Sequence, residues 1–138
     1  FFYTGLTRKS HKYLKKQKKN YSKNISKLLS LKNLTKTFIT EIQKKSLNIK
    51  KIGVLLGENW KLKKKFTNEI SNNLLDKIYK DAIDSGCYGG KLLGAGGGGF
   101  FLFVCQKKYH KKVVKKLKRC ERVDLNLINS SANIIYSE

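Results

Sequence analysis

The chain has 138 residues, the length of one domain, and is 40% hydrophobic with seven Phe and seven Tyr, a composition that excludes a disordered polymer. No apolar run reaches the length of a membrane-spanning helix. The formal net charge of +22 favours a polyanionic partner, but only three of the 31 basic residues are Arg (Arg8, Arg119 and Arg122). Because recognition of base edges favours Arg, we interpret the Lys excess as solvated faces and do not expect nucleic acid as a partner.

The first part of the chain is predicted to form one strand and two helices. Residues 1–4 have the character of a short strand that ends at Gly5. Thr7 is a plausible cap for a basic helix over residues 8–19. A second helix is expected over residues 26–45, with apolar residues at helical spacing: Leu31, Leu34, Phe38, Ile39 and Ile42.

Two further helices are predicted in the middle of the chain. The helix over residues 49–65 is expected to bury Ile52, Leu55, Leu56 and Trp60. Asn72 or Asn73 caps the next helix, and Gly86 ends it. Its apolar stripe is the clearest in the sequence and consists of Leu74, Leu75, Ile78, Tyr79, Ala82 and Ile83.

The last third of the chain is predicted to be mostly strands. Residues 90–95 and 100–106 form two strands around a glycine-rich loop, and a helix over residues 109–119 follows. Alternating apolar residues predict a strand over 123–127, and residues 134–136 a final short strand. This order predicts one α+β domain over residues 1–138, an antiparallel sheet of about four strands with helices packed on one face.

The glycine-rich loop is the principal candidate site. Its residues are Gly94, Ala95, Gly96, Gly97, Gly98 and Gly99. The spacing satisfies the dinucleotide fingerprint, but an apolar strand follows where that fingerprint needs a helix, and no Gly-Lys-Ser/Thr closes a Walker loop. Two interpretations remain: a loop whose backbone N–H groups bind an anion, or a tight turn crowded against a neighbouring element.

Four segments carry a family resemblance. Residues 90–100 (GKLLGAGGGGF) resemble the third motif of the GHMP small-molecule kinases. Residues 2–8 (FYTGLTR), 55–63 (LLGENWKLK) and 70–79 (ISNNLLDKIY) extend the resemblance toward the heptose 7-phosphate kinase branch. The resemblance implies the C-terminal domain of such a kinase, a ferredoxin-like elaboration, and a loop that supports the ATP-phosphate loop of an N-terminal domain.

The same resemblance implies a cofactor and partners. ATP and Mg²⁺ would be bound mainly by the N-terminal half, which has no counterpart here and would also supply the general base. The partners would then be a sugar phosphate and the N-terminal domain, and the fragment alone would be inactive. We assign no catalytic residue in this chain. A galactose- or mevalonate-type kinase and a basic nucleic-acid-binding module remain as alternatives.

Four side chains are candidates for binding the substrate. Lys91 precedes the loop and could reach a phosphate, although a solvated Lys on a strand flank explains it equally well. Arg8 suits bidentate phosphate binding, and Thr4 flanks the same turn. Glu58 could bind sugar hydroxyl groups beside Trp60, or it could balance neighbouring Lys residues while Trp60 belongs to the core.

The cysteines and histidines do not predict a metal site. Cys87, Cys105 and Cys120 form no CxxC pair, and His11 and His110 lie far apart in the sequence. We expect Cys105 and Cys120 to be buried free thiols, Cys120 on the apolar stripe of the last helix. Free thiols are typical of a reducing compartment, so a cytoplasmic location is expected.

Overall fold

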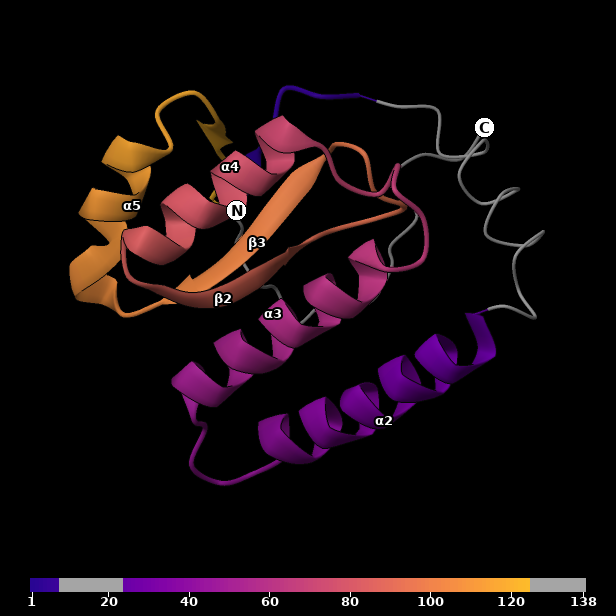
Figure 1. The fold of residues 1–138 in the computed structure, drawn as a ribbon. Coiled ribbons are helices and arrows are strands. Elements are labelled where there is room, and N and C mark those ends of the chain that lie inside the picture. Colours follow the sequence, from indigo (N-terminus) through magenta and orange to yellow (C-terminus); the bar gives the residue numbers. More distant parts are fainter. Residues whose placement is uncertain (8–23, 125–138) are drawn as a thin grey trace, which may run out of the picture.

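The structure is a computed structural model, and it describes residues 1–7 and 24–124 (Figure 1). The predicted helix over 8–19, the strand over 134–136, Arg8 and His11 lie outside these residues. In chain order the elements are β1 (Phe2–Tyr3), α2 (Ile25–Ile42), α3 (Ile49–Lys64), α4 (Asn73–Asp84), β2 (Cys87–Leu92), β3 (Phe100–Cys105), the 3₁₀ turn η2 (Lys107–Tyr109), α5 (His110–Lys116) and β4 (Glu121–Arg122).

The strands form one antiparallel sheet in the order β2-β3-β1-β4. Phe101 of β3 lies opposite Leu92 on one side and opposite Phe2 on the other, which fixes the register. The short strand at the start of the chain therefore lies in the interior of the sheet, between β3 and β4. The predicted α+β class with a four-stranded antiparallel sheet is confirmed.

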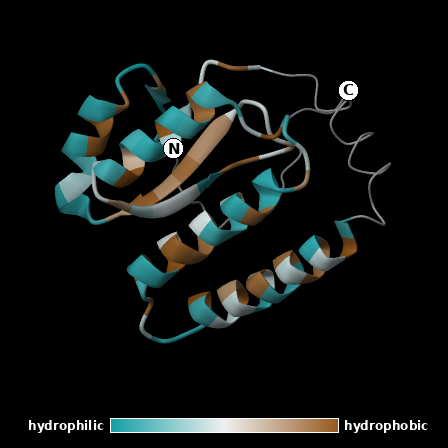
Figure 2. Cartoon of the chain, in the orientation of Figure 1, coloured by the Kyte–Doolittle hydropathy of each residue, from teal (hydrophilic) through white to brown (hydrophobic). Residues whose placement is uncertain are grey.

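The hydrophobic core lies on the face of the sheet that carries Phe101 and Phe103. Their rings stack with centroids 5.1 Å apart. Trp60 of α3 meets Phe101 edge-on at 5.7 Å, and Tyr79 of α4 lies 6.2 Å from the same ring. Side chains alternate along a strand, so the neighbouring Phe100 points the other way and remains 40% exposed. Figure 2 shows β3 as a largely apolar strand among helices that alternate polar and apolar residues.

Helix α4 follows the sequence prediction closely. The Asn72 side chain accepts a hydrogen bond from the N–H of Leu75 at 3.0 Å, which caps the helix. Gly86 follows the helix with a φ of +107°, a value that favours glycine. The expected unbroken stripe is wrong at its first residue, because Leu74 lies 39% exposed in the first turn while Leu75 is fully buried.

Helix α3 packs against β2 through glycines, which the predicted apolar face did not include. Gly53 and Gly57 are buried, whereas Ile52 and Leu56 are only half-buried. A Cβ on Gly53 would lie 2.6 Å from the Cβ of Tyr88, so no side chain fits there. The two backbones therefore approach closely, and α3 lies beside the edge strand β2 (Figure 1).

Helix α2 forms an outer layer. It packs against α3, which lies between α2 and the sheet (Figure 1). Glu41 is its one buried side chain, the apolar residues that face α3 are only half-buried, and Ile39 and Ile42 are 44% and 47% exposed. The helical spacing in this segment thus predicted the helix correctly without identifying a buried face.

The C-terminal part differs in detail from the sequence prediction. Helix α5 is shorter than expected at both ends, and the 3₁₀ turn η2 precedes it. Cys120 is buried but follows the helix, and Cys105 is half-buried. Strand β4 pairs with β1 just before the predicted strand over 123–127, most of which lies outside the described residues.

Candidate functional site

The glycine-rich loop joins β2 to β3 through an unusual backbone path. Gly94, Gly96, Gly97 and Gly99 have φ values of +75°, +106°, +78° and +100°. Residues with a side chain rarely adopt this left-handed region, because Cβ clashes with the backbone. The abundance of glycine therefore follows from the path of the chain, as expected for a closely approached loop.

Backbone hydrogen bonds fix the loop to two distant segments. The N–H of Gly97 donates to the carbonyl of Ile70, and the N–H of Gly99 donates to the carbonyl of Leu6, each at 2.9 Å. The carbonyl of Gly99 accepts from the N–H of Thr4 at 2.9 Å and from the Thr4 hydroxyl at 2.8 Å. The loop is thus held between the segment after β1 and the segment before α4.

The same segments leave no room for side chains on one side of the loop. A Cβ on Gly98 would lie 2.4 Å from the carbonyl oxygen of Leu6, and a Cβ on Gly96 would lie 3.1 Å from the Cα of Ile70. The predicted crowding is therefore present, and backbone causes most of it. Among the described residues, the N–H groups of Ala95 and Gly98 have no backbone acceptor, whereas residues 94–95 form a turn that engages the Gly96 N–H.

Two lysines lie at the start of the loop. Lys63 of α3 donates a hydrogen bond from Nζ to the carbonyl of Gly94. Burial lowers the pKa of Lys63, and the charge of Lys91 lowers it further. Burial also lowers the pKa of Lys91 on β2. The sequence analysis proposed Lys91 but missed Lys63, since nothing in the sequence sets it apart from the other Lys residues of its helix.

The remaining predicted substrate ligands are not brought to the loop as a group. Thr4 is buried, and its hydroxyl bonds the loop itself and accepts from the N–H of Leu6 at 3.3 Å. Glu58 is exposed on α3, where it lines a groove toward α2 with Thr37 and Lys61. Arg8 lies outside the described residues. Substrate binding by these three residues stays a prediction.

The groups at the loop suit an anion better than a cation. Backbone N–H groups and ammonium groups donate hydrogen bonds to phosphate oxygens, whereas Mg²⁺ needs oxygen ligands such as carboxylates. In the part of the chain that the structure describes, no three His, Cys, Asp or Glu side chains form a group that could hold a metal ion. The donors at the loop therefore suit an anionic group such as a phosphate.

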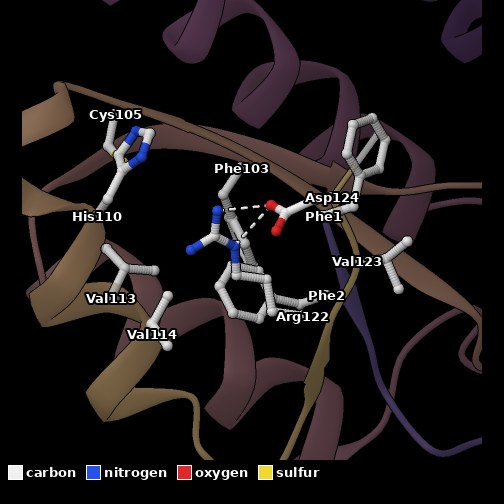
Figure 3. Close-up of a pocket in the computed structure, with 10 residues that line it drawn as sticks. All are labelled: Phe1, Phe2, Phe103, Cys105, His110, Val113, Val114, Arg122, Val123 and Asp124. Carbon is white, nitrogen blue, oxygen red and sulfur yellow. Dashed lines mark hydrogen bonds and ion pairs between the residues drawn. The ribbon is translucent and has the colours of Figure 1, made fainter. Parts of the chain in front are cut away.

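A separate cavity lies at the other end of β3, between the sheet and α5 (Figure 3). It has a volume of about 210 Å³ and is lined largely by apolar side chains, together with Cys105 and His110. Arg122 and Asp124 also line it and form an ion pair there, with Nε and Oδ1 2.9 Å apart. None of the predicted site residues lines this cavity, so it is not part of the loop site.

No helix within residues 1–7 and 24–124 is both long and apolar enough to cross a membrane.

Comparisons with known proteins identify relatives among small-molecule kinases. Over 67 residues the chain is 45% identical to D-glycero-alpha-D-manno-heptose 7-phosphate kinase of Campylobacter jejuni. The aligned segment covers 47% of this chain and 19% of that protein. The chain is also 28% identical over 134 residues to the bifunctional fucokinase/GDP-fucose pyrophosphorylase of Arabidopsis thaliana. This aligned segment covers 94% of this chain and 12% of that protein.

Solved mevalonate kinases share the fold. The L. major enzyme in complex with R-mevalonate superposes with a TM-score of 0.73 at 21% identity, over 85% of this chain and 36% of that one. A second mevalonate kinase gives a TM-score of 0.64 at 26% identity, over 86% of this chain and 35% of that one. The chain thus spans less than a fifth of the curated relatives it matches and about a third of these mevalonate kinases.

The sequence pattern of the family described as "GHMP kinases C terminal" matches residues 38–122. This range contains α3, α4, the glycine loop and both strands that carry the loop. The match agrees with the fold of the mevalonate kinases and with the kinase relatives in sequence. The chain belongs to the GHMP kinase C-terminal domain family.

Proposed function

We propose that the chain is the C-terminal, substrate-side domain of an ATP-dependent sugar kinase. The full-length enzyme would transfer the γ-phosphoryl group of Mg·ATP to the anomeric hydroxyl of heptose 7-phosphate, in the cytoplasm, for the synthesis of nucleotide-heptoses and surface polysaccharide. The observation that carries this proposal is the tethered glycine loop, in a chain 45% identical over 67 residues to a heptose 7-phosphate kinase. The fragment alone would be inactive.

The role proposed for the loop follows from its backbone. Phosphoryl transfer depends mostly on positioning and on stabilising charge on the transferred group. A loop without side chains lets phosphates approach its free N–H groups, and its tethers keep those groups in place. An N-terminal domain would supply the ATP-phosphate loop, the ligands of Mg²⁺ and the general base.

The first test is ATP consumption by the full-length protein that contains this chain. The substrates are heptose 7-phosphate, galactose and mevalonate, each at the same concentration. Turnover with the heptose alone is the expected result. Turnover with galactose or mevalonate would support the proposed kinase activity but reject heptose 7-phosphate as its substrate. No turnover with any of them would contradict the proposed activity.

A substitution in the loop tests its role directly. Gly97→Val in the full-length enzyme should lower kcat by about 100-fold or more, because a branched side chain at a φ of +78° displaces the backbone N–H groups. Equal kcat values for wild type and Gly97→Val would refute the role of the loop.

The net charge favours a second candidate, a basic module that binds nucleic acid. Four exposed Lys residues lie on the short helix α5: Lys111, Lys112, Lys115 and Lys116. This candidate predicts tight binding to RNA or DNA that weakens steeply with salt. Binding that disappears at physiological salt would reject it, and this candidate leaves the glycine loop without a role.

A further inference from the structure

We propose that Lys63 and Lys91 together form a binding site for a phosphate group beside the glycine loop. The site would hold a phosphate of one of the two substrates, and the identity of that ligand rests on the proposed kinase function. The site itself rests on geometry and charge.

Two polar side chains of the proposed site, Asn59 and Lys91, line one cavity between α2, α3 and β2, and Lys63 lies outside its lining. This cavity has a volume of about 170 Å³, and its other walls are mostly apolar side chains of α2 and α3. Lys63 follows Asn59 by four residues on α3, which places both on one face of the helix. The Lys63 Nζ reaches the carbonyl of Gly94, so this face leads from the cavity to the loop.

The two ammonium groups have no counter-charge among the described residues. Burial is the larger cause of the lowered pKa of Lys63, repulsion from Lys91 is the other, and no carboxylate raises either pKa. Lys64, next along the helix, behaves differently and pairs with Asp76 at 2.8 Å. Because two half-buried like charges without a counter-ion destabilise a fold, a bound anion is the simplest reason for the arrangement.

A phosphate group matches the donors that remain. An ammonium group has three N–H bonds, and Lys63 uses one of them on the Gly94 carbonyl, which leaves two for a ligand. Lys91 and the amide of Asn59 can add further donors from the same region. A phosphate dianion accepts several such bonds at once and converts the repulsion between the lysines into attraction to a shared partner.

Calorimetric titration of the full-length protein with inorganic phosphate tests the site without any turnover. Lys63→Gln and Lys91→Gln should each weaken phosphate binding by about tenfold, because each removes a charge-assisted hydrogen bond. Lys63→Arg and Lys91→Arg should recover part of the loss. Lys61→Gln is the matched control, since Lys61 is an exposed Lys of the same helix that faces α2, and it should bind as the wild type does.

Two results would overturn the proposal: no saturable binding of phosphate to the wild type, or equal affinity in wild type and both Gln variants. A binding loss caused by misfolding is recognised by the melting temperature. Lys91→Gln should melt at or above the wild-type temperature, because the substitution removes an uncompensated half-buried charge.

Steady-state kinetics then identify which phosphate occupies the site. A selective rise in KM for the sugar phosphate in the Gln variants assigns the site to that substrate, and a selective rise in KM for ATP assigns it to the nucleotide. Unchanged KM values for both would overturn the proposal for the working enzyme. If the protein shows no kinase activity but binds phosphate through both lysines, the proposed function fails and the site stands.

Discussion

Gly94 and Gly98 of the loop exclude side chains by different means. Gly94 has a φ of +75°, and a Cβ there would meet no atom within 4 Å. Gly98 does not adopt a positive φ, but a Cβ there would lie 2.4 Å from the carbonyl oxygen of Leu6. The first position costs only local backbone strain when substituted, whereas the second forces two chain segments apart.

Alanine substitutions should separate these two causes. Gly94→Ala should lower the free energy of unfolding by about 1–2 kcal/mol, the cost of a left-handed residue with a side chain. Gly98→Ala should cost about 3 kcal/mol or more, because neither backbone segment can yield without losing the hydrogen bond between Gly99 and Leu6. Urea denaturation of the two variants measures the difference. A larger loss for Gly94→Ala would contradict the tight contact at Gly98.

Among the helices and strands, α3 contributes most to the site. Its buried glycine side meets β2, Trp60 reaches the core, and Lys63 reaches the loop. Gly53, Gly57 and Trp60 share one face of the helix by their i, i+4, i+7 spacing, and Lys63 lies at its flank, so one side of α3 sets the distance to the sheet, the packing of the core and the start of the loop. A change in how closely α3 approaches β2 should move Lys63 relative to Gly94.

Gly53→Ala tests the close packing of α3. In a helix exposed to solvent, this substitution stabilises by about 1 kcal/mol through propensity. Here we expect destabilisation by about 2–3 kcal/mol, because the new Cβ would lie 2.6 Å from the Cβ of Tyr88. Val54→Ala, at a 40% exposed position of the same helix, should change stability by less than about 0.5 kcal/mol. If urea denaturation shows that Gly53→Ala is more stable than the wild type, then β2 can move away from α3 to accommodate the new Cβ.

Whether a structural feature could be predicted from the sequence depends on which physical property the sequence pattern reflects. Asn72 and Gly86 were predicted because caps and stops act locally, through the residue's own backbone and nearest turn. Gly53 was missed because apolar periodicity counts large side chains, and a helix that packs through its backbone leaves no such signal. Lys63 was missed because its role depends on a carbonyl 31 residues away.

At the scale of the whole molecule, the dominant feature is charge. A net charge of +22 on 138 residues repels itself, and the repulsion favours the unfolded chain, in which charges lie farther apart. Three of the described ion pairs join side chains that are both at least a third exposed, for example Lys80 with Asp84 at 2.6 Å, and such pairs contribute little. The stability of this domain should therefore depend on ionic strength.

Salt should raise the melting temperature. Raising NaCl from about 0.01 M to about 0.1 M shortens the screening length from about 30 Å to about 10 Å, which weakens the repulsion between distant lysines. We expect an increase of about 5 °C by calorimetry, the shift that roughly 1 kcal/mol produces in a small domain. Replacing Lys111, Lys112 and Lys115 with Gln should reduce the increase. A melting temperature that falls with added salt would show that attractive pairs dominate.

The tethers of the loop determine when its conformation can form during folding. Its two anchoring carbonyls belong to Leu6 and Ile70, and the loop itself spans residues 94–99, well beyond both in the sequence. No single stretch of the chain can thus acquire the working loop during folding, since the first strand, the segment before α4 and the β2–β3 hairpin must all meet. The tethered conformation of the loop is therefore a property of the completed domain, and a partly folded intermediate would lack it even with the β2–β3 hairpin formed.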